Sequence, residues 1–129
     1  EVRVTQADVR KIQLAKAPIA AGIQILLQEK DWKIKDIDQV ILAGGFGSYM
    51  RKESAAEIGL IPKELVKCTH SVGNAAGEGA VSAALASEAR TELEQLQKQM
   101  RYVELSTHEA FSDIFIREMS FTNSYMRSE

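Results

Sequence analysis

The feature that most restricts the fold of this sequence is a pair of segments in which a short apolar run ends in glycine and a helical pattern follows. The two segments are VILAGGFGS, residues 40–48, and SVGNAAGEGA, residues 71–80. The run at residues 40–43 lacks polar alternation, which is typical of a strand buried on both faces of a parallel sheet. A second short strand is predicted over residues 68–72. Because open parallel sheets bind ligands at the carboxyl ends of their strands, the pair predicts an α/β fold and marks this edge for a ligand.

The spacing of the glycines leaves their role open. It matches neither the dinucleotide-binding fingerprint nor a phosphate loop with its Gly-Lys-Ser/Thr ending. In the first segment the glycines either let a ligand approach bare backbone or serve a tight turn. In the second, Gly73, Gly77 and Gly79 either border the same edge or allow close helix packing.

A long helix is predicted upstream of these segments. Thr5-Gln6-Ala7-Asp8 reads as a capping box, and the helix should end near Lys30, with a kink at Pro18. Residues at helical spacing predict one stripe, of which all but one are apolar: Val9, Ile12, Lys16, Ile19, Ile23 and Leu26. The other flank carries small residues that let neighbouring backbone approach: Ala15, Ala17, Ala20, Ala21 and Gly22.

Lys16 is the exception in that stripe. A charge in an apolar stripe must find a partner or reach a cleft, and a cleft would make Lys16 a candidate ligand contact. The alternative, more usual for lysine, is that its stem packs while its ammonium reaches the edge of the interface.

The rest of the chain predicts shorter elements. A helix over residues 53–58 is stopped by Gly59 and Pro62, and an Ala-rich helix from Ala75 through Leu85 continues or restarts at a second capping box, residues 91–94. Residues 102–105 alternate weakly and predict a third strand. A capping box at residues 106–109 opens a last helix with one apolar face: Phe111, Ile114, Phe115 and Met119.

The predicted order is therefore helix, strand, short helix, strand, long helix, strand, helix. This order indicates a three-layer, helix-rich α/β lobe with a small, mostly parallel sheet and a long, buried first helix. We expect residues 1–122 to form this lobe and residues 123–129 to be a polar tail.

Composition excludes several classes of function. The chain has 129 residues and a formal charge of −2, without a basic run that could follow a phosphate backbone, so no nucleic-acid partner is expected. The longest strictly apolar and glycine run, residues 40–47, is far shorter than the ~20 residues of a membrane helix. A membrane span is therefore not expected. The first residues, EVRVTQADVR, carry charges where a signal peptide needs its apolar region, so no signal peptide is expected and we predict a cytoplasmic protein. The chain begins at Glu1 with a helix signal within five residues, as a fragment of a longer chain would.

Metal and nucleophile chemistry have little support. The single cysteine, Cys68, can form neither an internal disulfide nor an iron-sulfur cage, so a reducing compartment is the simplest interpretation. Cys68 and His70 lack the further ligands of a metal site, and His108 reads as a residue of a first helical turn. A Cys-His catalytic pair stays an alternative to a half-buried structural thiol. No metal-binding or catalytic residue is predicted.

Several blocks of the sequence, taken in order, carry a resemblance. They are VTQAD (4–8), IQLAKA (12–17), LAGGFGS (42–48), IGLIP (58–62), SVGNAAG (71–77) and ELSTH (104–108). In these blocks the chain resembles the C-terminal part of the reductive activators of corrinoid proteins and related ferredoxin-like proteins. The resemblance implies half of an actin-like ATPase (ribonuclease H-like) fold, in the superfamily of acetate and sugar kinases, heat-shock chaperones and actin.

The resemblance also implies a function for the parent protein. Members of the family couple ATP hydrolysis to transfer of a low-potential electron onto an inactive cobalt(II) corrinoid. They carry a plant-type [2Fe-2S] domain at the N-terminus and the ATPase region last. The implied cofactors are ATP with Mg in the parent protein and a [2Fe-2S] cluster in an N-terminal domain absent here, and the implied partner is the corrinoid protein of a methyltransferase system.

Only a few positions receive a role from this resemblance. Gly44 and Gly45 match the superfamily's adenosine motif, with Phe46, Gly47 and Ser48 alongside. The helix with Gly77 and Gly79, which resembles Gly-x-Gly-Ala, packs near the same cleft. The two phosphate loops, the Mg-positioning acid and the cluster cysteines have no match here, so this chain alone should be neither an ATPase nor an electron donor.

Two other functions remain open. One is a non-enzymatic interaction module that forms a homodimer through the long first helix or the Phe111 face. The other is a self-contained small nucleotide-binding domain, which is disfavoured because no phosphate-anchoring motif accompanies the glycines.

Overall fold

The computed structural model of the chain describes residues 2–121, except for the side chains of residues 46–48. The predicted tail, residues 123–129, lies outside the described residues. The α-helices are α1 (Gln6–Lys30), α2 (Gly44–Tyr49), α3 (Lys52–Glu57), α4 (Ala75–Leu85), α5 (Ser87–Gln99) and α6 (Phe111–Glu118). Short 3-10 helices are η1 (Ile34–Asp36), η2 (Lys63–Cys68) and η3 (Leu105–Thr107), and the strands are β1 (Val40–Leu42) and β2 (Thr69–Ser71).

Helix α1 begins and ends where the sequence predicts. The Asp8 N–H donates to Thr5 Oγ1 at 3.2 Å, and the Thr5 N–H donates to Asp8 Oδ2 at 3.0 Å, which completes the capping box. These two bonds satisfy donors that a helix start leaves without intrahelical partners. The helix continues through Pro18 and stops at Lys30, where Asp31 turns into the left-handed region with φ 53°.

The buried face of α1 is not the predicted apolar stripe. Ile12, Ile19 and Leu26 are each 43–51% exposed. The buried residues are mostly the small ones of the other flank, joined by Lys16: Lys16, Ala17, Ala20, Ala21, Gly22 and Ile25. Small side chains let other elements approach the axis of α1 closely. The face with small residues is therefore the one that packs, although the other face carries larger apolar side chains.

Two apolar clusters involve α1 and form the core. In the first, Ala21 and Ile25 of α1 pack with Ile114 of α6. In the second, Ile23 of α1 packs against the buried group Ala55, Ala56, Leu60 and Ile61 from α3 and the segment after it. The helix stop after α3 is confirmed, since Gly59 has φ +77° and the Leu60 N–H donates to the Ala55 carbonyl at 2.8 Å.

The sheet is parallel, as predicted, and has two strands within the described residues. Val40 pairs with Thr69, Ile41 with His70 and Leu42 with Ser71. The prediction that the first strand is buried on both faces is wrong, because Ile41 is 59% exposed.

Two other predictions of local structure are also wrong, and one alternative is excluded. Residues 102–105 form no strand, since residues 102–104 are irregular and Leu105 begins η3. The residues at 106–109 do not cap α6, because the side chain of Glu104 instead accepts from the Ser106 N–H at 3.1 Å and supports η3. Thr91 is no helix cap, since its hydroxyl donates to the Ser87 carbonyl at 3.2 Å within α5.

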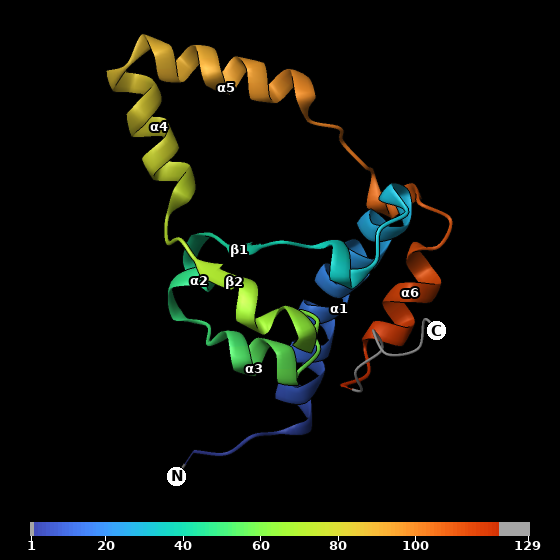
Figure 1. Ribbon diagram of the computed structural model, residues 1–129. Coiled ribbons are helices and arrows are strands. Elements are labelled where there is room, and N and C mark those ends of the chain that lie inside the picture. Colours follow the sequence, from blue (N-terminus) through green and yellow to red (C-terminus); the bar gives the residue numbers. More distant parts are fainter. Residues whose placement is uncertain (1, 122–129) are drawn as a thin grey trace.

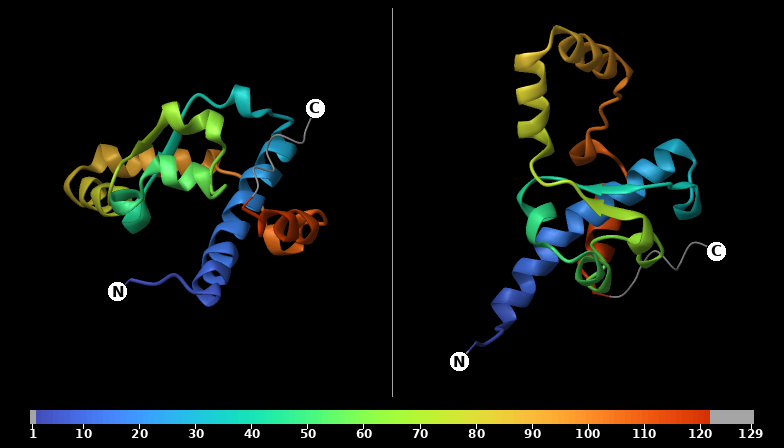
Figure 2. Two further views of the ribbon diagram at one scale, coloured as in Figure 1. Left: turned by 90° about the horizontal axis from the view of Figure 1, so that it is seen from below. Right: turned by 60° about the vertical axis from the view of Figure 1, so that its left-hand side comes forward.

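Helices α4 and α5 form an arm that extends away from the sheet (Figures 1 and 2). They break at Ala86, whose backbone is extended, and contact each other around this corner. Neither α4 nor α5, both described throughout, contains a buried residue. The described residues therefore lack the third layer of the predicted lobe. Among them, no helix combines the length and apolar character that a membrane span requires.

Candidate functional site

The glycine turns that follow the two strands meet at one edge of the sheet. Parallel strands bring their carboxyl ends to the same side, and here the Gly44 N–H donates to the Gly73 carbonyl at 2.6 Å. One residue earlier, the Val72 N–H donates to the Leu42 carbonyl at 3.0 Å. The two segments that the sequence singles out are thus joined through their backbones.

Gly44 and Gly73 both have backbone conformations that favour glycine. Their φ angles are +81° and +62°. A side chain in this region is strained by contact between its Cβ and the backbone. Gly45 follows with an ordinary negative or extended φ, so glycine at that position does not answer a backbone requirement.

Open space lies in front of this backbone. A Cβ built at Gly44, Gly45 or Gly73 meets no heavy atom of the described residues within 4 Å. A flat ligand group could therefore lie against the turn without displacing protein. We call the turns at residues 44–45 and 73 the glycine edge.

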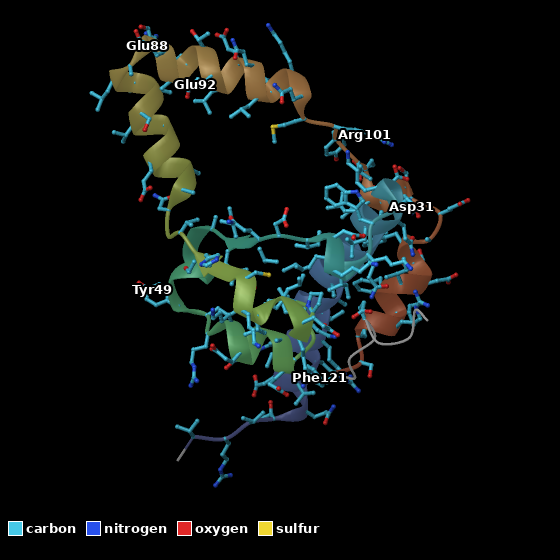
Figure 3. The ribbon with its side chains drawn as sticks, viewed as in Figure 1. Asp31, Tyr49, Glu88, Glu92, Arg101 and Phe121 are labelled. Atoms are coloured by element: carbon cyan, nitrogen blue, oxygen red, sulfur yellow. The ribbon has the colours of Figure 1, made fainter. Side chains whose placement is uncertain are left out.

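The first turn is also the start of a helix. Residues 44–48, predicted as a turn, belong to the short helix α2, which ends at the exposed Tyr49 (Figure 3). The backbones of Phe46, Gly47 and Ser48 lie in α2, but their side chains lie outside the described residues. The predicted roles of these three residues stay predictions.

Gly77 and Gly79 occur in α4, which begins directly after the second turn. Asn74 caps this helix, with its Oδ1 accepting from the Gly77 N–H at 3.2 Å. A Cβ at Gly77 would collide with the Asn74 side chain, so the cap itself accounts for glycine there. A Cβ at Gly79 meets nothing within 4 Å among the described residues. Close helix packing, the alternative left open by the sequence, explains neither glycine.

Lys16 lies in the interior beside α6. Its side chain is 1% exposed, and its Nζ lies 3.7 Å from Oε2 of Glu118, which is also 1% exposed. Burial lowers the pKa of Lys16, and the attraction to Glu118 opposes that shift without cancelling it. Lys16 thus has a partner in the interior, and the alternative in which its ammonium reaches the edge of the interface is wrong.

Two residues of this interior group have no counterpart in the sequence analysis. Glu118 carries the partner charge, and Gln24 donates through Nε2 to Glu118 Oε1 at 2.6 Å. The spacing of Glu118 from Ile114 and Phe111 could have indicated this role, because residues at that spacing lie on the same face of a helix.

Within the described residues, the partners of Cys68 and His108 are neither each other nor His70. The Cys68 thiol is half-buried and donates to the Leu65 carbonyl at 3.3 Å, as a structural thiol does. His70 is exposed on β2. His108 accepts from the Ala110 N–H through Nδ1 at 3.3 Å, and its Nε2 lies 3.6 Å from Glu29. The described residues contain no group of three His, Cys, Asp or Glu side chains placed to hold a metal ion.

The residues of this chain fit a nucleoside but not a [2Fe-2S] cluster. The glycine edge offers backbone and space to a nucleoside. A [2Fe-2S] cluster takes four thiolates, whereas this chain has one cysteine. The thiol of that cysteine, Cys68, donates a hydrogen bond to the Leu65 carbonyl. No part of the cluster can therefore be assigned to these residues.

Known proteins match nearly the whole of this chain. Residues 1–128 match the family described as the C-terminal domain of RACo, the ASKHA domain. The chain is 32% identical over 126 residues to the corrinoid activation enzyme RamQ of Eubacterium limosum, covering 98% of this chain and 21% of that protein. The structure of a reductive activator for a corrinoid, iron-sulfur protein is similar with a TM-score of 0.80 and 38% identity, over 88% of this chain and 18% of that one. The chain thus spans about a fifth of the length of these relatives.

Proposed function

The chain belongs to the family of C-terminal ASKHA domains of RACo, and from that premise we propose that it is the adenosine-contacting lobe of an ATP-dependent reductive activator of corrinoid proteins. In this proposal the lobe acts as part of a longer protein and has no catalytic activity alone. Two relatives support it by their names, corrinoid activation enzyme and reductive activator for a corrinoid, iron-sulfur protein.

The observation that carries the proposal is the backbone bond between Gly44 and Gly73. It unites two glycine turns into one edge with open space in front of it. Bare backbone lets a nucleoside approach within van der Waals distance, where a side chain would hold it off. In an open sheet this is also the end of the strands at which ligands bind.

Within the chain we assign the nucleoside to the backbone of Gly44 and Gly45. Phe46, Gly47 and Ser48 follow in α2 and would border the ligand, and Gly77 and Gly79 would border it from α4. Lys16 is left out of this assignment, because its ammonium is buried beside Glu118. When bound, ATP supplies the free energy of its hydrolysis to the parent protein.

The rest of the machinery belongs to other parts of the parent protein. We place there the phosphate loops, the acid that positions Mg, and a [2Fe-2S] domain. The partner would be the corrinoid protein of a methyltransferase system, and the location the cytoplasm. Sequencing the source gene through the codon for Glu1 tests this: four cysteines with plant-type cluster spacing upstream support it, and a frame that starts at Glu1 contradicts it.

Gly45→Val tests the nucleoside assignment directly. A Cβ at Gly45 meets no heavy atom in the described chain, so the variant should fold while its side chain fills the nucleoside space. We expect at least a tenfold loss in affinity for Mg-ATP, measured by calorimetry on the parent protein. Ala84→Val is the control, because it places a valine at an exposed position near the far end of α4.

The two variants separate a local effect from a general one. Unchanged affinity in Gly45→Val, with the fold verified by circular dichroism, would contradict the assignment. An equal loss in Ala84→Val would show that the effect is not specific to the glycine edge.

A homodimer is the second candidate, supported by an exposed stripe on α1. Ile12, Ile19 and Leu26 recur every seven residues and are each about half exposed. The Phe111 face, in contrast, packs on α1 through Phe111, Ile114 and Phe115 and is occupied within the chain. Sedimentation equilibrium tests this candidate, and a strict monomer at high concentration would contradict it.

A further inference from the structure

Three polar side chains meet in the interface between α1 and α6. Lys16 and Gln24 come from α1, and both face the carboxylate of Glu118 on α6. Gln24 donates to one carboxylate oxygen at 2.6 Å, and the ammonium of Lys16 lies 3.7 Å from the other. The same two helices also share an apolar cluster, formed by Ala21, Ile25 and Ile114.

The arrangement brackets the position of the carboxylate along α1. Lys16 and Gln24 are eight residues apart, which is about 12 Å along a helix axis. Glu118 touches one of them with each oxygen, so it sits between them. A shift of α6 by one turn in either direction, about 5 Å, would take the carboxylate away from either Lys16 or Gln24.

The apolar part of the interface defines this position less sharply. The surface that α1 buries is formed largely by alanine and glycine, with Ala17, Ala20, Ala21 and Gly22 all buried. Small side chains give a smooth surface, and apolar contact is non-directional. Several placements of Ile114 and Phe115 along such a surface would bury similar area.

The charges contribute little to the strength of the interface. Removing a lysine and a glutamate from water is unfavourable, and replacing such buried pairs by apolar residues is often neutral or stabilising. The lowered pKa of Lys16, which has burial as its largest cause, agrees with this balance. The role of the pair must then be sought in the geometry that it selects.

We propose that Lys16, Gln24 and Glu118 form a register lock, which selects one position of α6 on α1 without being needed for the stability of the interface. The lock acts by disfavouring displaced placements, because each of them separates Glu118 from Lys16 or from Gln24. The proposal is independent of the nucleoside assignment.

The test is the double variant Lys16→Met/Glu118→Leu in the 129-residue chain. Cys68→Ser is also introduced, so that the native thiol takes no spin label. Spin labels at Lys11→Cys on α1 and Ser112→Cys on α6 report the position of α6, since both residues are exposed. With the lock intact, we expect one narrow distance distribution by pulsed dipolar spectroscopy. In the double variant we expect the fold to be retained and the distribution to split or broaden by about 5 Å, one helical turn.

A matched control and a second variant complete the experiment. Glu94→Leu/Lys98→Met makes the same changes at two exposed positions of α5 and should leave the distribution narrow. Gln24→Met removes one side of the bracket and should broaden the distribution less than the double variant does.

Two results would overturn the proposal. A folded double variant with one narrow, unshifted distribution would mean that apolar packing alone sets the register. Loss of the folded state in the double variant, seen by circular dichroism, would mean that the three residues supply stability instead.

Discussion

The chain contains two pairs of neighbouring helices that differ in what they bury. Helices α1 and α6 enclose alanines, isoleucines and a charged pair, whereas α4 and α5 meet only at the corner near Ala86 and contain no buried residue (Figure 1). Helix α4, AAGEGAVSAAL, nonetheless has a larger fraction of apolar residues than α1, which contains several charged residues. Average hydropathy therefore does not identify the helices of the core, and the elements that each helix contacts decide its burial.

The largest expected effect comes from removing one charge of the buried pair. Glu118→Leu leaves the ammonium of Lys16 buried without a counter-charge, and we expect a loss of about 3 to 5 kcal/mol in the free energy of unfolding. Urea denaturation measures it. The matched change Glu94→Leu, at an exposed position of α5, should shift stability by less than about 0.5 kcal/mol. Equal effects of the two variants would erase the contrast between the helix pairs.

Truncation of an apolar side chain tests the same contrast without charge. Ile25 is fully buried, so Ile25→Ala should lower the free energy of unfolding by about 2 to 4 kcal/mol. Leu96 in α5 is 54% exposed, and Leu96→Ala should lower it by less than about 1 kcal/mol. A larger loss for Leu96→Ala than for Ile25→Ala would place the core of the chain in the arm.

Removal of the α4 cap tests whether the arm unfolds independently of the core. Asn74→Ala deletes the acceptor for the Gly77 N–H, and such caps stabilise a helix by about 1 kcal/mol. Because the arm buries nothing, we expect faster hydrogen exchange in α4 and unchanged exchange in the centre of α1. Faster exchange in both helices would mean that the arm and the core unfold as one unit.

Acid provides the smallest effect, at the exposed start of α1. Hydrogen bonds from the Thr5 side chain and backbone hold the pKa of Asp8 below its ordinary value. A carboxyl with a depressed pKa stabilises the fold above its unfolded pKa and loses that contribution as the pH falls through the folded value. Fraying of the first turn should therefore begin only below about pH 4, followed by NMR titration of Asp8. Titration in Thr5→Ala should move to higher pH, and an unchanged titration would contradict the capping box.

Local signals in the sequence predict local structure well. The Thr5–Asp8 capping box, the end of α1 near Lys30 and the glycine stop at Gly59 are confirmed. Each depends on residues within a few positions of one another, so the sequence contains all the partners. The same holds for the first strand and the glycines that end it.

Features that depend on distant partners could not be read in this way. Gln24 and Glu118 are 94 residues apart. The pattern of residues in α1 does not indicate that Glu118 is the acid that pairs with Lys16. The exposure of Ile41 follows from what covers the sheet, which a run of apolar letters does not specify. Conversely, Ser106-Thr107-His108-Glu109 has the letters of a capping box, but Glu104 competes for the Ser106 N–H and α6 begins later.

The bond between Gly44 and Gly73 also has a mechanical consequence. Gly73 is followed at once by Asn74 and α4, so the direction of the arm is set by the backbone at this turn. An 11-residue helix is about 16 Å long, so a rotation of about 10° at the turn would carry its far end through about 3 Å. A small change at the glycine edge would thereby be larger at the end of the arm.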